Sequence, residues 1–176
     1  MEKKMKLKID KKSLLGYLTY LVIIASGIVF DQLTKLLAVK FLKGADDVKV
    51  IGNFLKLSYV ENRGSAFGML KDARWVFMSV STLAIIAMIA YLFTAKNQSR
   101  LYTVSIAVIA SGGIGNMIDR IALGYVVDFV SVKYFAVFNG ADSLVCVGAG
   151  FLILAMLLDL IKEAKAQKEK KSRGEE

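Results

Sequence analysis

The sequence of 176 residues contains no histidine, no proline and one cysteine. Without histidine, catalysis by Ser-His or Cys-His pairs and histidine-ligated zinc are excluded. A single cysteine cannot form an internal disulfide, and we expect Cys146, inside an apolar run, to act as a small apolar side chain. Any chemistry must therefore come from carboxylates, lysines, hydroxyls or amides.

Charge is absent from four long stretches of a chain that is 56% hydrophobic: residues 14–30, 75–95, 101–118 and 143–158. A bilayer core of about 30 Å needs roughly 20 apolar residues of helix, and these runs approach that length once their flanks are counted. The sequence therefore predicts an all-α polytopic membrane protein with four transmembrane helices. We expect one membrane-embedded domain over residues 1–176.

Six lysines precede the first apolar run, as they do in a cleaved signal peptide. However, no small-x-small cleavage pattern ends this run, and apolar character resumes after Asp31 in QLTKLLAVKFL. We therefore expect the run to be retained as a membrane anchor.

Basic residues are concentrated at both ends, with six Lys before the first run and six Lys or Arg within residues 162–173. The positive-inside rule then places both tails, 1–13 and 162–176, in the cytoplasm, and connections 31–74 and 119–141 outside. Connection 31–74 has eight Lys or Arg against five acids, which opposes the rule, but it is long and of mixed charge. Attraction to anionic lipid explains the basic tails, so no nucleic-acid partner is expected.

The outer connections contain short alternating patterns. VKVIGNFLKLSYVEN (48–62) predicts two strands joined around Gly52 and Asn53, and VVDFVSV (126–132) predicts a strand that joins them. We therefore expect a small extracytoplasmic β-sheet beside the helices.

In this topology, eight polar residues fall at the outer membrane boundary or just beyond it: Asp31, Asn62, Asn116, Asp119, Arg120, Asp128, Asn139 and Asp142. A charged group at the bilayer centre costs roughly 2.5–3.5 kcal/mol, so such groups are usually paired, solvated or functional. Two carboxylates brought together share a proton, so that one acts as a base and the other as an acid. Asp128 and Asp142 could thus hydrolyse an amide, while substrate is held by Arg120 and the amides of Asn62, Asn116 and Asn139.

Other uses of these residues stay open. The Asp and Asn oxygens could bind a cation, although the adjacent Arg120 weighs against it. A small transporter or channel could use the acids as an ion relay, although relay residues should lie near the membrane midplane. A Ser65–Lys71 peptidase pair lacks a recognisable nucleophile setting, and a scaffold without chemistry would leave the cluster unexplained.

Four blocks in order resemble the lipoprotein signal peptidases, the bacterial signal peptidases II: DQLTK (31–35), ENRGSAFGML (61–70), GGIGNMIDRIALGYVVDFV (112–130) and FNGADSL (138–144). The resemblance covers about residues 14 to 160. It implies an aspartyl endopeptidase, without cofactor or metal, embedded in the bacterial cytoplasmic (inner) membrane. Such an enzyme cuts the signal peptide from prolipoproteins on the N-terminal side of a diacylglyceryl-modified cysteine.

The same resemblance implies roles for particular residues. Asp128 and Asp142 match the catalytic pair; substrate-binding or site-shaping positions match Asn62, Asn116, Arg120 and Asn139; and supporting positions match Asp31, Lys35, Gly64 and Asp119. It also implies a β-cradle lying on the membrane, a monomer in contact with membrane lipids, and inhibition by a peptide of the globomycin type. The chain departs from the family at Ala136, where Pro is frequent, and at Gly140, which frees the backbone ahead of Asp142.

Overall fold

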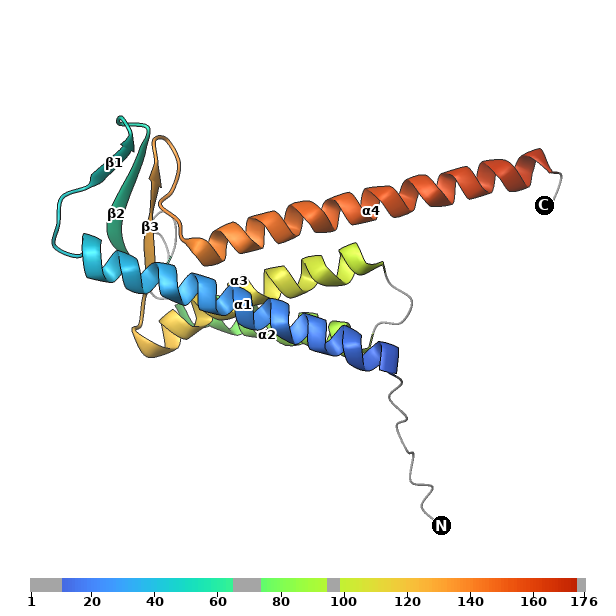
Figure 1. The fold of residues 1–176 in the computed structure, drawn as a ribbon, viewed down its shortest axis with the longest axis horizontal. Helices are drawn as coiled ribbons and strands as arrows, with labels where there is room; N and C mark the ends of the chain where they lie inside the picture. Colours follow the sequence, from blue (N-terminus) through green and yellow to red (C-terminus); the bar gives the residue numbers. More distant parts are fainter. Residues whose placement is uncertain (1–10, 65–73, 95–98, 174–176) are drawn as a thin grey trace, which may run out of the picture.

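The computed structural model describes residues 11–64, 74–94 and 99–173. They form four helices, α1 (Lys11–Leu42), α2 (Arg74–Thr94), α3 (Arg100–Ala122) and α4 (Gly140–Ser172), and three strands, β1 (Val48–Ile51), β2 (Leu55–Asn62) and β3 (Val126–Val132). The helices form a bundle with the sheet at one end (Figure 1). The start of α1 and the end of α4 both lie at the opposite end (Figure 1).

Helix α3 is the centre of the bundle, where it packs against each of the other three helices. Small residues allow this close packing. A side chain at Gly112 would overlap the backbone oxygen of Ala141, and one at Gly148 would lie 3.0 Å from the backbone oxygen of Ser105. Backbones approach this closely in membrane bundles where the interface carries glycine, alanine or serine. The contact holds the first turn of α4 against α3.

The sheet has the order β1-β2-β3, with both pairs antiparallel. The predicted two-stranded ribbon and the third strand are therefore confirmed. Between β1 and β2, Gly52 has a φ of 50°, a conformation that glycine adopts readily. Asn62 pairs with Val126 and Val60 with Asp128, so Asn62 and Asp128 lie diagonally on one face of the sheet.

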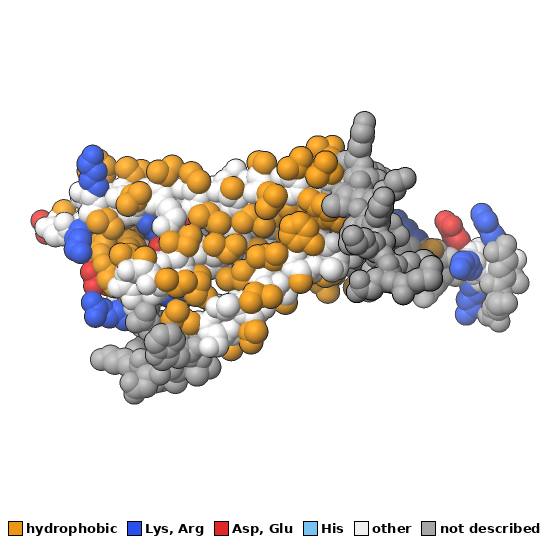
Figure 2. All heavy atoms as spheres, turned by 90° about the horizontal axis from the view of Figure 1, so that it is seen from below, with side chains coloured by type: hydrophobic (Ala, Val, Ile, Leu, Met, Phe, Trp, Pro, Cys, Tyr) orange, Lys and Arg blue, Asp and Glu red, His pale blue; other side chains and the backbone are white. Residues whose placement is uncertain are grey.

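Among the described residues, three helical segments are long and apolar enough to cross a membrane: Leu14–Leu42, Arg100–Ala122 and Gly140–Ser172. In α2 the described apolar stretch, Met78–Thr94, is shorter, so the fourth span stays a prediction. Hydrophobic side chains cover the middle of the face in Figure 2, whereas charged side chains gather at its two ends.

The helices extend beyond the apolar runs from which they were predicted. Helix α1 continues past Asp31 to Leu42, because Asp31 and Lys35 form an i,i+4 ion pair of 2.8 Å and pack against α3. Helix α4 includes most of the predicted basic tail and ends at Ser172. The connection that follows α1 therefore begins after Leu42, whereas the sequence predicted that it begins at residue 31.

Candidate active site

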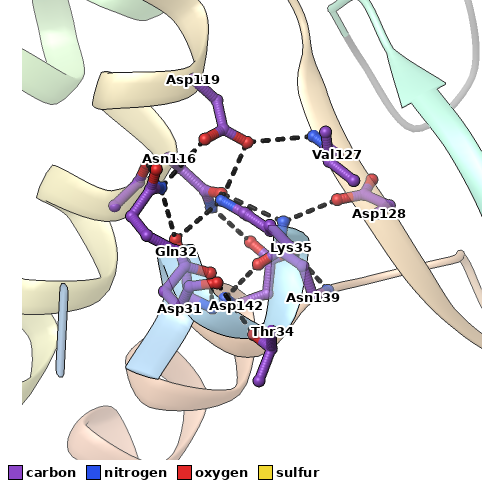
Figure 3. A network of polar contacts seen from close by, with 12 residues as sticks. Asp31, Gln32, Thr34, Lys35, Asn116, Asp119, Val127, Asp128, Asn139 and Asp142 are labelled. Atoms are coloured by element: carbon purple, nitrogen blue, oxygen red, sulfur yellow. Dashed lines mark hydrogen bonds and ion pairs between the residues drawn. The ribbon is translucent and has the colours of Figure 1, made fainter. Parts of the chain in front are cut away.

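Asp128 and Asp142, here called the aspartate pair, bind the same residue although they come from different elements. Asp128 lies in β3, and its Oδ1 accepts a hydrogen bond of 2.6 Å from the Asn139 side chain. Asp142 lies in the first turn of α4, and its Oδ2 accepts a bond of 3.2 Å from the Asn139 backbone N–H. The structure therefore brings the two predicted acids into one polar site (Figure 3).

Asn139 connects the pair because it caps α4. Its side-chain oxygen accepts the Asp142 backbone N–H at 2.9 Å, and this reciprocal arrangement is a capping box. An Asn followed three residues later by an acid, just before an apolar run, is a sequence signal for such a cap. Asn139 was expected to bind substrate or to shape the site, and in the structure its side-chain NH₂ binds Asp128.

Two further amides complete the surroundings of the pair. Asn62 donates from Nδ2 to Asp128 Oδ2 at 2.9 Å, and Asn116 donates from Nδ2 to Asp142 Oδ1 at 2.8 Å. From the residues that the structure describes, each of the four carboxylate oxygens thus accepts one N–H. Since a carboxylate oxygen has two lone pairs, one such bond leaves it able to accept a proton, a water molecule or a substrate group.

Beneath the pair lies a buried ionic cluster of Asp31, Lys35 and Asp119. The Lys35 ammonium, in a residue that is 3% exposed, lies 2.8 Å from Asp31 Oδ2 and 3.0 Å from Asp119 Oδ2. Asp31 also accepts the backbone N–H of Ala141 at 2.8 Å, and Asp119 accepts that of Val127 at 3.0 Å. The cluster therefore connects α1 and α3 to the residues that precede Asp142 and Asp128 (Figure 3).

Gln32 and Gly115 belong to this cluster, and the sequence analysis gave neither a role. Gln32 Nε2 donates to Asp119 Oδ1 at 3.0 Å and to Asp31 Oδ2 at 3.2 Å, and a side chain at Gly115 would overlap the Asp31 carboxylate. If the first helix had been predicted to continue beyond residue 30, the spacing of Gln32 and Lys35 would have placed both side chains on the same face of it.

The remaining predicted residues lie at the edge of the site. Gly64 donates its N–H to the side-chain oxygen of Asn62 at 3.2 Å. Arg120 donates to the Asn116 backbone oxygen at 3.4 Å within α3. Ser65 and Lys71 of the serine–lysine alternative lie outside the described residues.

The environment of Asp128 favours its protonated form. Burial, and to a lesser extent the nearby charge of Asp142, raise the pKa of this carboxyl from 3.8 to about 6 against the opposing effects of Asn62, Asn139 and Lys35. Asp128 is 2% exposed. A carboxyl group with such a pKa can donate a proton near neutral pH.

In the part of the chain that the structure describes, no group of three or more His, Cys, Asp or Glu side chains is placed to hold a metal ion. The carboxylates of Asp31 and Asp119 face the Lys35 ammonium.

Residues 23–158 match the family model of signal peptidase (SPase) II. The chain belongs to the signal peptidase II family. It is therefore an aspartic peptidase, a hydrolase, and the family together with the apolar helices indicates a bacterial multi-pass membrane protein.

Known proteins agree with this assignment to signal peptidase II. The chain is 43% identical to the lipoprotein signal peptidase of Clostridium tetani over 142 residues, which cover 78% of this chain and 91% of the relative. It is 45% identical to that of Caldanaerobacter subterraneus subsp. tengcongensis over 139 residues, covering 78% and 94%. A solved structure described as a bacterial membrane enzyme has a TM-score of 0.73 at 31% identity, covering 81% of this chain and 89% of that one.

Proposed function

We propose that this signal peptidase II removes the signal peptide from prolipoproteins, on the N-terminal side of a diacylglyceryl-modified cysteine, with Asp128 and Asp142 as its catalytic pair. The observation that carries the proposal is the shared site of the two carboxylates. Both bind Asn139, and every carboxylate oxygen accepts one amide N–H. Its family and its similarity to lipoprotein signal peptidases support the substrate class.

The chemistry follows from two carboxyl groups that hold one proton between them. The ionised member removes a proton from water, so that the water oxygen can attack the carbonyl carbon of the scissile peptide. The protonated member donates to the carbonyl oxygen, where negative charge develops. No cofactor is needed for these steps, because the pair provides both the base and the acid.

The site belongs at the outer surface of the cytoplasmic membrane in this proposal. The aspartate pair lies at the sheet end of the bundle, while the start of α1 and the end of α4 lie at the other end (Figure 1). The basic residues at both ends of the chain favour the cytoplasm, which places the sheet outside if α2 is a fourth span. A substrate with two acyl chains stays in the bilayer, so its scissile bond can reach a site at this depth.

Replacing either acid tests the proposal directly. We expect Asp128→Asn and Asp142→Asn to lower the rate of cleavage by about 10²–10⁴-fold or more, because the loss of an acid or base has effects of this size. The assay combines purified protein with a diacylglyceryl-modified precursor, and with its unlipidated form, with and without chelator and a globomycin-type peptide.

Asp159→Asn is the matched control for both variants. Asp159 lies on the same helix as Asp142, but it forms an exposed ion pair of 3.3 Å with Lys162 near the other end of the bundle. We expect this variant to cleave at the wild-type rate. Normal processing by a folded Asp128→Asn or Asp142→Asn protein would show that the pair is not catalytic.

A further inference from the structure

Three asparagines surround the aspartate pair, and each is oriented by a group that can only donate a hydrogen bond. The Asn62 oxygen accepts from the Gly64 backbone N–H at 3.2 Å, and the Asn139 oxygen accepts from the Asp142 backbone N–H at 2.9 Å. The Asn116 oxygen accepts from the Lys35 ammonium at 2.9 Å and from the Asn139 side-chain NH₂ at 3.1 Å. Neither a peptide N–H nor an ammonium can accept a hydrogen bond, so each amide oxygen must face its donor.

The orientation of each asparagine side chain determines whether its NH₂ group or its oxygen faces the aspartate pair. With its oxygen held, each NH₂ group points to a carboxylate: Asn62 and Asn139 to Asp128, and Asn116 to Asp142. The reversed orientation of Asn116 would bring its NH₂ against the Lys35 ammonium and its oxygen against Asp142. Both contacts would be repulsive, so Lys35, together with the Asn139 NH₂ that donates to the same oxygen, determines which face of Asn116 the Asp142 carboxylate receives.

Asn116 differs from the other two asparagines because its oxygen meets a full positive charge. A charge-assisted hydrogen bond polarises the amide, which makes the N–H on its other side a stronger donor. That N–H binds Asp142 at 2.8 Å. The effect of the buried Lys35 charge is thus transmitted through one amide to one oxygen of the pair.

The two acids also differ in their elements. Asp142 is in the first turn of α4, where the helix N-terminus favours a negative charge, and it is only partly buried. Asp128 lies in a strand and is 2% exposed, which disfavours a charge. Within the described ranges, the charged groups near the pair are Asp31 and Lys35 from α1, Asp119 and Arg120 from α3, and the two acids themselves.

We propose that Lys35 is a positioning residue which, by orienting and polarising Asn116, makes Asp142 the ionised member of the pair and leaves the shared proton on Asp128. This inference rests on the proposed function and deepens it. Lys35 acts on Asp142 through Asn116 and does not touch the reacting atoms. Its charge also lowers the pKa of Asp128, but there burial has the larger effect and raises it.

The assignment gives the reaction a defined course. Asp142 takes a proton from water as the water oxygen bonds to the carbonyl carbon, and Asp128 gives its proton to the carbonyl oxygen, which forms a tetrahedral diol. Asp142 then gives its proton to the leaving nitrogen as the carbon–nitrogen bond breaks. Asp128 takes back a proton from a diol hydroxyl as the carbonyl re-forms, so each acid returns to its starting state.

The pH dependence of kcat/KM tests the assignment, because its acidic limb reports the required base and its basic limb the required acid. We expect Asn116→Ala, which removes a donor from Asp142, to move mainly the acidic limb to higher pH. We expect Asn62→Ala, the matched variant for Asp128, to move mainly the basic limb to higher pH. Each shift should be on the order of one pH unit, as expected for one lost hydrogen bond to a charged group.

Lys35 requires a charge-balanced test. Lys35→Met alone leaves two buried carboxylates without a cation, so it is expected to destabilise the fold. Combining Lys35→Met with Asp119→Asn preserves the net charge of the cluster and an acceptor for the Val127 N–H. We expect this double variant to move the acidic limb in the same direction as Asn116→Ala but by less, because Asn116 keeps its hydrogen bond from Asn139, and to lower kcat with KM unchanged. Asp119→Asn alone retains Lys35 and should keep the wild-type acidic limb.

The possible outcomes of these experiments distinguish a failure of this inference from a failure of the proposed function on which it rests. Absence of cleavage of lipidated precursor by the wild-type protein would overturn the proposed function. Cleavage by the wild-type protein with the two limbs moved in the reverse order would overturn only the assignment of the proton. An unshifted acidic limb in the folded double variant would overturn the role of Lys35.

Discussion

At Asp128, burial and hydrogen bonding act on one carboxyl group in opposite directions. The N–H groups of Asn62 and Asn139 stabilise its ionised form, whereas removal from water and the charge of Asp142 stabilise its protonated form. Burial has the larger effect, and the pKa rises to about 6. The asparagines therefore moderate the effect of burial, so that Asp128 can lose its proton within an ordinary pH range.

This pKa predicts how stability changes with pH. Between pH 3.8 and about 6, the folded protein retains the Asp128 proton while the unfolded chain has lost it, so the unfolding free energy falls as pH rises. The decrease is on the order of 3 kcal/mol for this one group. We expect Asp128→Asn to lack this component in thermal unfolding followed from pH 4 to 7 in detergent.

Asp159→Asn serves as the control, because it leaves the Asp128 site intact and should retain the wild-type dependence. Identical pH dependence in the wild-type and Asp128→Asn proteins would contradict the raised pKa.

At the scale of elements, α3 approaches both α1 and α4 closely because it presents glycines at the two points of contact. Gly115 of α3 lies against the Asp31 carboxylate of α1, and Gly112 lies against the backbone of Ala141 at the start of α4. A methyl group at either position would separate two helices at the point where the ionic cluster joins them. The geometry of the aspartate pair therefore depends on small residues that carry no chemistry.

We expect Gly115→Ala to lower the unfolding free energy by about 1–3 kcal/mol, as overpacking does in a close-packed core. The same substitution should reduce cleavage, because Asp31 holds the Ala141 N–H next to Asp142. Thermal unfolding and the precursor assay measure the two effects. The control is Gly150→Ala, since no atom lies within 4 Å of the added carbon in α4.

Gly150→Ala should leave cleavage unchanged and raise helix stability by up to about 1 kcal/mol, because alanine favours helices more than glycine does. Equal effects of the two substitutions would contradict the proposed close contact at Gly115.

At the scale of the whole molecule, the sheet projects from the helix ends and exposes apolar side chains at its tip. The backbone N–H of Lys133 donates to the Phe54 oxygen at 2.8 Å, which brings the β1–β2 turn against the loop after β3. In that loop Tyr134 is 92% and Phe135 69% exposed. Exposed aromatic groups beside lysines fit the headgroup region of a membrane.

We therefore expect a tryptophan at position 135 to report a membrane environment. In a Trp75→Phe background, Phe135→Trp should show blue-shifted emission in anionic vesicles and quenching by lipids brominated near the headgroup. Glu169→Trp, at the exposed far end of α4, should emit as a water-exposed tryptophan. Similar emission from the two positions would argue against contact between the sheet tip and the bilayer.

Much of the architecture follows from patterns that are local in the chain. The uncharged runs indicated the helices, because a helix in lipid needs an unbroken apolar stretch. Alternation indicated all three strands, because successive side chains of a strand point to opposite faces. Helix ends were less predictable: α1 passes through Asp31 because Lys35 of the same helix pairs with its charge. Lys35 is in turn bound by Asn116 and Asp119 of α3, which are more than 80 residues away in the chain.

The sequence by itself determined the classes of chemistry, the apolar segments and the residue types that form the site. Only the tertiary structure decided which oxygen each amide binds, that Lys35 and Asn139 both donate to Asn116, and that Asn139 joins both acids. The physical reason is the distance along the chain between the residues that interact. Hydropathy and strand periodicity are properties of neighbouring residues, whereas hydrogen bonds in the site join residues of α1, β2, β3, α3 and α4, and their directions depend on how those elements pack.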